Sequence, residues 1–261
     1  MAMIQFDAAT ARLLENAYRG RDVVKRRLAT LEALAPEAGD TIVDVGSGPG
    51  YLTVELARAV GEAGEVIAVD PSADMRRAAA SQCNGFANVR ILDGTANELP
   101  LADASAAGAA SLQVFEYLND IPGALAEIRR VLRPGGRLVI GDWHWDSWIW
   151  HSTEPERMAK MMSAWDHHLA DRGVPARLPH MMRQAGYQIE TIRPLVLLDT
   201  VLRNDGVAMM LLNLMQAYVL QNDLVDEPTA RAWADEQRRL AADGCFFFSW
   251  CILSCRGAVR S

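Results

Sequence analysis

Thr41-Ile-Val-Asp-Val-Gly-Ser-Gly-Pro-Gly50 is the stretch on which the rest of the chain depends. Its first five residues, apolar apart from Thr41 and Asp44, predict a short buried strand, and the pattern after Gly50 predicts a helix over residues 51–60. The three glycines between them carry no Cβ and tolerate positive φ, so a ligand can lie directly against the backbone. The first amides of the following helix point at such a ligand.

The glycine spacing separates two classes of ligand. A dinucleotide-binding turn has the pattern G-x-G-x-x-G, whereas this chain has G-x-G-x-G, with Tyr51 in place of the last glycine. Pro49 removes an amide that could bind a pyrophosphate. Asp44, at the end of the strand, suits an ammonium group better than a phosphate. The turn therefore predicts a nucleoside that carries an amino acid, S-adenosylmethionine, and a tight turn without a ligand is the alternative.

Composition limits the class of protein. The 261 residues are 50% hydrophobic with a formal net charge of −7, which is enough for a packed core and leaves no basic surface for nucleic acid. No secretory leader is visible, and the most apolar helix, over residues 207–220, is too short and polar to span a bilayer. The four cysteines lack zinc-site or C-x-x-C spacing. We expect free thiols, no metal and a cytoplasmic location.

Strands and helices alternate over residues 40–142. The second strand ends at Asp70, about twenty residues after the glycines, where an acid can accept from both hydroxyls of a ribose or cap the next helix. Repeated alternation implies right-handed crossovers and a mostly parallel sheet. Strands are expected over residues 41–45, 66–69, 88–92, 106–112 and 137–141, and helices over 51–60, 72–82 and 121–132.

Both ends of the chain depart from this alternation. Residues 7–35 predict two helices, an arm that packs on the surface or folds over the ligand. After residue 142 we expect helices over 154–170, 176–185, 206–222 and 228–243, and strands over 189–202 and 245–255. The last two strands would close the sheet with an antiparallel edge. We therefore predict one domain, 1–261: an N-terminal helical arm (1–38), a ligand-binding core (39–142) and a substrate side (143–261) with cap helices about 206–243.

Four stretches carry a family resemblance. They are Val43-Asp-Val-Gly-Ser-Gly-Pro-Gly50, Val66-Ile-Ala-Val-Asp-Pro71, Gln113-Val-Phe-Glu-Tyr117 and Arg130-Val-Leu-Arg-Pro-Gly-Gly-Arg-Leu138. In this order and spacing the chain resembles the class I S-adenosylmethionine-dependent methyltransferases, in particular the small-molecule group similar to ubiquinone/menaquinone methylases. With the pattern above, it implies an α/β, Rossmann-like fold: a seven-stranded, mostly parallel sheet with helices on both faces, an antiparallel last strand and a helical cap.

The resemblance also implies a cofactor site. The glycine loop would hold the methionine part of S-adenosylmethionine, and Asp70 would hold the ribose. The loop after the third strand usually carries an acid for the adenine amino group; here Thr95 stands at that position, with Asp93 as the alternative. The full set of implied cofactor residues is Tyr18, Asp44, Gly46, Ser47, Gly48, Gly50, Asp70, Pro71, Met75, Gly94, Thr95, Ala96, Gln113 and Val114.

Methyl transfer from a sulfonium needs alignment above all, and a base if the acceptor loses a proton. Candidates follow the fourth and fifth strands, where open α/β sheets bind ligands. His144 is the first choice, since the unperturbed pKa of histidine lies near neutrality; Tyr117 and His151 are the other two chosen, and Glu116, Asp142 and Asp146 lie nearby. Four tryptophans at 143, 145, 148 and 150 form either core or an aromatic wall for a flat acceptor. We assign Trp143, Trp145 and Met210 to the acceptor.

The expected function is transfer of a methyl group to O, N or C of a small, apolar or aromatic acceptor. Two alternatives remain: a nicotinamide-dependent oxidoreductase on the same kind of sheet, and a non-catalytic S-adenosylmethionine-binding protein. The expected partner is the small-molecule acceptor alone, with neither nucleic acid nor membrane, and the protein is expected to be a monomer or a homodimer.

Overall fold

Strand β1 (Thr41–Val45) lies inside the sheet of the computed structural model, which describes residues 18–259. It is flanked by β2 (Glu65–Val69) and β4 (Ala106–Leu112), and four of its five residues are buried. The strand order is β3–β2–β1–β4–β5–β8–β6, with β7 on the free edge of β8. The first five strands in this order are parallel, whereas β8 runs antiparallel to β5, β6 and β7.

The other elements follow in chain order. The remaining strands are β3 (Val89–Leu92), β5 (Leu132–Trp143), β6 (Ile149–Trp150), β7 (Tyr187–Asp199) and β8 (Phe248–Val259). The helices are α2 (Arg21–Leu34), α3 (Tyr51–Val60), α4 (Ala73–Gln82), α5 (Ile121–Val131), α6 (Pro155–Trp165), α7 (Val174–Gln184), α8 (Val207–Gln221) and α9 (Glu227–Ala242), with short 3-10 turns η1 (Phe115–Tyr117), η2 (Trp145–Ser147) and η3 (Asp166–His168).

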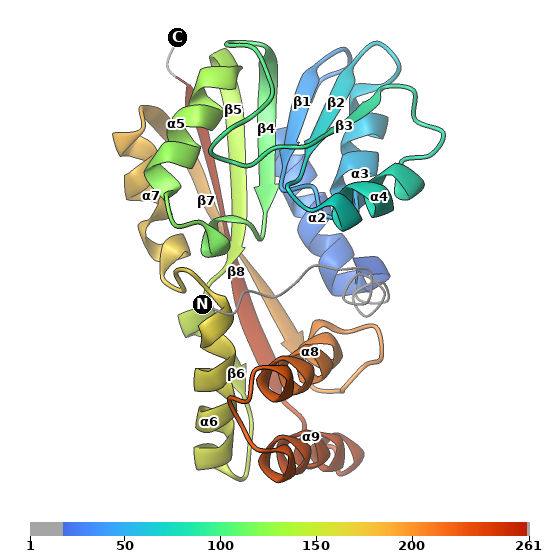
Figure 1. Cartoon of the computed structure of the whole chain (residues 1–261), viewed down its shortest axis with the longest axis vertical. Coiled ribbons are helices and arrows are strands. Elements are labelled where there is room, and N and C mark those ends of the chain that lie inside the picture. Colours follow the sequence, from blue (N-terminus) through green and yellow to red (C-terminus); the bar gives the residue numbers. More distant parts are fainter. Residues whose placement is uncertain (1–17, 260–261) are drawn as a thin grey trace.

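Helices cover both faces of the parallel part of the sheet (Figure 1). One apolar cluster joins α2 and α3 to one face, and a second joins α5 and α7 to the other. The alanine-rich β4 lies beneath α2, and Gly108 allows close packing, because a Cβ there would stand 3.1 Å from Leu34 Cδ1 and Ile42 Cδ1. Small residues in β4 thus let a helix approach the centre of the sheet.

The predicted fold class is confirmed, with some corrections. The sheet gains an eighth strand, the two-residue β6, which is too short to leave a sequence pattern. Strand β5 starts at Leu132, with an irregular segment around Gly135 before its main pairing with β4. Strand β8 extends to Val259, and its alternation of buried and half-buried residues is interrupted at Leu253-Ser254. The first helix predicted within residues 7–35 falls mostly outside the described residues.

The second half of the chain builds a layer of its own around the extended strands β7 and β8 (Figure 1). Helices α6, α8 and α9 pack there over an apolar cluster that contains all seven tryptophans of the chain. Trp143, the last residue of β5, stacks on Trp250 with ring centroids 3.8 Å apart, so the aromatic segment that begins there forms packed core. Among residues 18–259, no helix combines the length and apolar character that crossing a bilayer requires.

A buried carboxylate fastens this layer together. Glu236 of α9 accepts hydrogen bonds from Ser152 Oγ and Thr153 N, both at 2.7 Å, and pairs with Arg157 Nη2 at 2.9 Å. Burial raises its pKa, but the hydrogen bonds from Ser152, Arg157 and Thr153 outweigh burial and bring the pKa down to about 2. The ionised form therefore stabilises the start of α6 against α9.

A glycine at the end of β1 decides how the strand ends pack. Gly46 has φ +71°, and a Cβ on it would overlap Val114 Cγ2, just beyond β4. Its amide donates to Val69 O at 2.8 Å, and the amide of Ser47 donates to the same oxygen at 3.1 Å. The ends of β1, β2 and β4 thus meet at one backbone position that only glycine occupies without strain.

Gly46→Ala tests this packing against Gly244→Ala, because both glycines have φ +71° but nothing lies within 4 Å of a Cβ at Gly244. The left-handed conformation alone costs about 1–2 kcal/mol in either variant. Overlap with Val114 adds about 1–3 kcal/mol for Gly46→Ala. Urea unfolding should therefore give a clearly lower unfolding free energy for Gly46→Ala than for Gly244→Ala. Equal stability of the two variants would contradict the close contact between Gly46 and Val114.

Glu236→Gln tests the buried carboxylate. A folded-state pKa of about 2 lies below the ordinary glutamate pKa of about 4.3, so this contribution is present above pH 5 and fades as the pH falls towards 2. Glu236→Gln should lose up to about 3 kcal/mol of unfolding free energy at pH 7 and lose the corresponding pH dependence. Glu227→Gln, in the exposed pair with Arg231, should change stability by under about 1 kcal/mol. Equal effects of the two variants would count against the assignment.

Candidate cofactor and acceptor site

Asp70 braces the glycine loop from the end of β2. Its Oδ2 accepts from Gly48 N and its Oδ1 from Ser72 N, each at 2.9 Å. Burial raises the pKa of Asp70, and these two amides and nearby Arg76 oppose the rise. A carboxylate oxygen has two lone pairs, so each still has capacity to accept from a hydroxyl in the cavity.

Asp44 is a buried acid with one neutral partner. Thr53 Oγ1 donates to its Oδ2 at 2.6 Å. Burial raises the pKa of Asp44 to about 7, against the hydrogen bond from Thr53 and with some repulsion from Asp70. A cation beside Asp44 would offset the cost of burying its charge, which is the property expected of an ammonium-binding acid.

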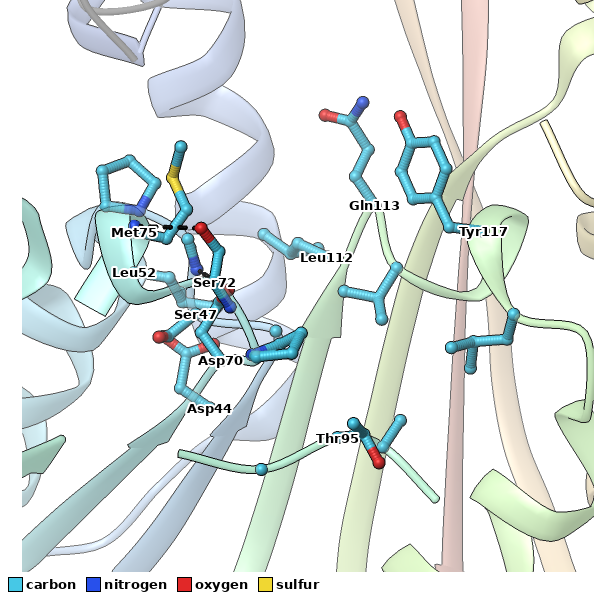
Figure 2. A pocket seen from close by; sticks show the side chains of 18 of the residues that line it. Asp44, Ser47, Leu52, Asp70, Ser72, Met75, Thr95, Leu112, Gln113 and Tyr117 are labelled. Carbon is cyan, nitrogen blue, oxygen red and sulfur yellow. Dashed lines mark hydrogen bonds between the residues drawn. The ribbon is translucent and has the colours of Figure 1, made fainter. Parts of the chain in front are cut away.

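A cavity of about 550 Å³ opens over these groups, within the size range of ligand sites. Figure 2 shows Asp44, Ser47 and Asp70 gathered on one side of it, while Gln113 and Tyr117 stand on the other with their side chains directed the same way. Ser47 Oγ is buried and has no hydrogen-bond partner among the described residues. An unpaired hydroxyl beside a buried acid and a glycine cradle fits the amino-acid part of S-adenosylmethionine.

Thirteen of the fourteen residues expected to bind the cofactor line this outer cavity. They are Tyr18, Asp44, Gly46, Ser47, Gly48, Asp70, Pro71, Met75, Gly94, Thr95, Ala96, Gln113 and Val114. Gly50 does not: a Cβ there would lie 3.0 Å from Ala79 Cα, so this glycine lets α3 and α4 approach each other. The motif therefore combines ligand-facing glycines with one that serves helix packing.

The end of the cavity expected to hold adenine differs from the family pattern. Thr95 lines it, and its Oγ1 accepts from Glu98 N at 3.1 Å, which leaves the hydroxyl proton available to a ligand. Asp93, the alternative, is exposed, pairs with Arg76 at 2.8 Å and does not line the cavity. Asn97, which the sequence did not single out, lines it, although its Nδ2 donates to Asp120 O.

The N-terminal arm reaches the cavity through Tyr18 and α2. Tyr18 stacks on Tyr51 at 5.4 Å between ring centroids. Arg27 donates to Tyr18 O at 2.6 Å and pairs with Glu55 at 2.9 Å. Arg26, one residue earlier, lines the cavity and binds Gln113 Oε1. The sequence predicts that these arginines lie in a helix, but it does not indicate that they face the cavity.

A second, inner cavity of about 50 Å³ adjoins the first. Tyr18, Val23, Arg26, Gln113 and Tyr117 line both, so they form the partition between them. The expected acceptor residues Trp143, Trp145 and Met210 all line the inner cavity, with Trp165, His168, Leu211, Leu214 and Trp250.

The two histidines chosen as bases, His144 and His151, line neither cavity. Trp143 and Trp145, on either side of His144, both line the inner cavity. His151 is exposed, with its backbone bound to Phe247 and Gln237. Of the three candidates, only Tyr117 is brought to the cavities.

A buried acid pair lies behind the partition. Glu116 Oε2 accepts from Trp145 Nε1 at 2.8 Å, and Asp142 Oδ1 accepts from Val114 N at 3.0 Å. Burial raises the pKa of both carboxyls, and their mutual repulsion raises that of Glu116 further. Tyr117 hydrogen-bonds to Glu116, and burial raises the pKa of its hydroxyl well above the usual value, so Tyr117 stays protonated at neutral pH.

Several known proteins are similar to this chain. A family model described as "Methyltransferase domain" matches residues 43–140. A demethylmenaquinone methyltransferase of Symbiobacterium thermophilum is 31% identical over 188 residues, covering 62% of this chain and 74% of that protein. A ubiquinone/menaquinone biosynthesis C-methyltransferase of Rubrivivax gelatinosus is 39% identical over 124 residues, covering 48% of this chain and 47% of that protein.

The chain therefore spans about half the length of some of the curated relatives it matches. A solved SAM-dependent methyltransferase from Aquifex aeolicus superposes with a TM-score of 0.56, covering 94% of this chain and 97% of that one; its 18% identity supports the fold alone. The glycine loop, the acid after β2 and these sequence relatives agree: the chain belongs to the class I S-adenosylmethionine-dependent methyltransferases, within the group similar to quinone methylases.

Proposed function

We propose that the protein transfers the methyl group of S-adenosylmethionine to a small, apolar or aromatic acceptor. The observation that carries the proposal is the pair of adjoining cavities: a polar one over the glycine loop and an aromatic one behind Tyr117. A cofactor in the first and the reacting edge of an acceptor in the second would meet at a shared partition, as in-line transfer requires.

The donor groups of the outer cavity divide between the parts of the cofactor. Asp44 would bind the ammonium group, the loop at Gly46–Gly48 the rest of the amino acid, and Asp70 the ribose hydroxyls. Thr95 and Asn97 would contact the adenine. When bound, the cofactor supplies a methyl group already activated by its sulfonium, so that the protein has to align the acceptor and exclude water.

Tyr117 is the catalytic residue of this proposal, in an orienting role. Its hydroxyl is a neutral phenol that is hydrogen-bonded to Glu116. It can therefore hydrogen-bond to the methyl-accepting substrate, but it cannot serve as a phenolate base at neutral pH. The chemistry of the pocket favours a small-molecule partner over a macromolecule. A cytoplasmic location, the absence of nucleic-acid binding and the choice between monomer and homodimer stay predictions from the sequence.

Asp70→Ala and Asp93→Ala test the function, because both acids neighbour Arg76 but only Asp70 lines the cavity. Wild-type protein with methyl-labelled cofactor should transfer label to at least one member of a panel of phenols, quinols, indoles and amines. Asp70→Ala should lose cofactor binding by calorimetry and all transfer, whereas Asp93→Ala should keep both.

Two results would contradict this proposal. Folded wild-type protein that binds no S-adenosylmethionine removes the cofactor assignment. Tight binding without transfer to any acceptor of the panel would favour a non-catalytic binding protein instead.

The raised pKa of Asp44 predicts a pH dependence of cofactor affinity. With a pKa of about 7 in the free protein, the carboxylate that attracts the ammonium group is lost as the pH falls, so the dissociation constant should rise about tenfold between pH 8 and pH 6. Asp44→Asn keeps the size of the side chain. This variant should bind the cofactor more weakly at pH 8 and should not show the tenfold change in affinity between pH 8 and pH 6. Calorimetry of wild-type protein and Asp44→Asn at the same pH values separates the titration of Asp44 from that of the cofactor's own amine. If the dissociation constants of the two proteins change in parallel with pH, Asp44 is not the group responsible.

A further inference from the structure

The inner cavity gathers four buried polar atoms that have no hydrogen-bond partner among the described residues. They are Arg26 Nε, Trp143 Nε1, Trp165 Nε1 and His168 Nε2, and all four side chains line the cavity. The exposed fractions of these residues are 6%, 1%, 2% and 1%. Buried polar atoms are nearly always paired, so four together indicate a site for a polar group of a ligand.

His168 supplies the acceptor atom of this set. Its Nδ1 contacts Trp165 O, a carbonyl that can only accept, so Nδ1 carries the proton and Nε2 keeps a free lone pair. Burial lowers the pKa of His168 to about 4, against the effect of that hydrogen bond, so the ring is neutral at neutral pH. The ring is held between Trp165, at 4.0 Å, and Trp145, at 5.2 Å between centroids.

The other three atoms are donors. Arg26 also stands 5.4 Å over the ring of Trp143, and its guanidinium is the cation on the wall of the inner cavity. Donors and an acceptor within aromatic walls match a hydroxyl group on an aromatic ring. Its oxygen can accept from one of the donors and keep its second lone pair for the methyl carbon, and its proton goes to His168. An ammonium acceptor fits poorly, because it would place a second cation beside Arg26.

The size of the cavity limits what enters it. About 50 Å³ is a third of the roughly 150 Å³ of an engineered cavity that binds benzene. The hydroxyl-bearing edge of a ring fits, and the remainder of the acceptor must lie in the outer cavity. Tyr18 and Tyr117, which line both cavities, would flank the ring at the partition. Tyr117 lies 6.0 Å from His168 between ring centroids, so the hydroxyl edge and the partition are neighbours.

We propose that the inner cavity is the acceptor subsite for a hydroxylated aromatic ring, which makes the protein an O-methyltransferase with His168 as the group that takes the hydroxyl proton. This rests on the proposed function. A lone pair of the hydroxyl oxygen forms the new bond to the methyl carbon, the carbon–sulfur bond breaks with its electrons on sulfur, and the proton passes from oxygen to His168 Nε2. The oxygen becomes strongly acidic as the bond forms, so a neutral imidazole is basic enough.

The test compares two ligands of the same shape, 2-naphthol and 2-methylnaphthalene, by calorimetry on the full chain saturated with S-adenosylhomocysteine. Wild-type protein should bind 2-naphthol at least tenfold more tightly, because only the hydroxyl pairs with the buried atoms. His168→Phe should reduce that preference, because the hydroxyl proton loses its acceptor while the donors remain. His167→Phe, at the exposed neighbouring histidine, should keep it. Met210→Trp should fill the inner cavity and weaken the binding of 2-naphthol at least tenfold, while the affinity for S-adenosylhomocysteine stays unchanged.

The outcomes separate this inference from the function on which it rests. If wild-type protein does not bind S-adenosylhomocysteine, both fail. If it does but shows no preference for 2-naphthol, or keeps the preference in His168→Phe and Met210→Trp, the acceptor subsite is wrong while the cofactor site stands. Should His168→Phe fail to fold because Trp165 O loses its partner, Met210→Trp decides alone: unchanged 2-naphthol affinity in that variant overturns the inference.

Discussion

The contact between Gly46 and Val114 fixes where three strands end. Because Gly46 has no Cβ, the end of β1 can lie against the residues that follow β4, while its amide binds the last carbonyl of β2. Asp44, Asp70 and Gln113 come from three different strands, yet this packing brings them to one cavity. The outer cavity thus depends on how tightly the strand ends meet, and the loop after β3 completes its lining through Gly94, Thr95, Ala96 and Asn97.

Strand β8 connects the parallel core to the rest of the molecule. It runs from the parallel part of the sheet into the layer formed by α6, α8 and α9, where the tryptophans pack (Figure 1). The family model matches residues 43–140 only, so most of the wall of the inner cavity lies outside that region. The region that the family model matches thus supplies most of the outer cavity, whereas most of the wall of the inner cavity comes from the rest of the chain.

The parallel core could be predicted almost residue by residue, because buried strands and glycine turns leave local patterns. Side-chain direction in the second half could not. Trp143, His144 and Trp145 are consecutive, and sequence alone does not say which of them faces a cavity; the packing against Trp250 decides it. His168 was missed because it follows a helix far along the chain, and Arg26 because a helix pattern does not reveal which neighbour will cover it. Gly50 fits the motif, but whether it faces the ligand or the neighbouring helix depends on the position of α4.

A crystal structure with bound S-adenosylhomocysteine tests the central claim most directly. We predict the amino-acid part over Gly46–Gly48, its ammonium group within hydrogen-bond distance of Asp44, and both ribose hydroxyls on Asp70. A ligand seated elsewhere on the protein, or one whose ribose makes no contact with Asp70, would contradict the assignment of this cavity to the cofactor.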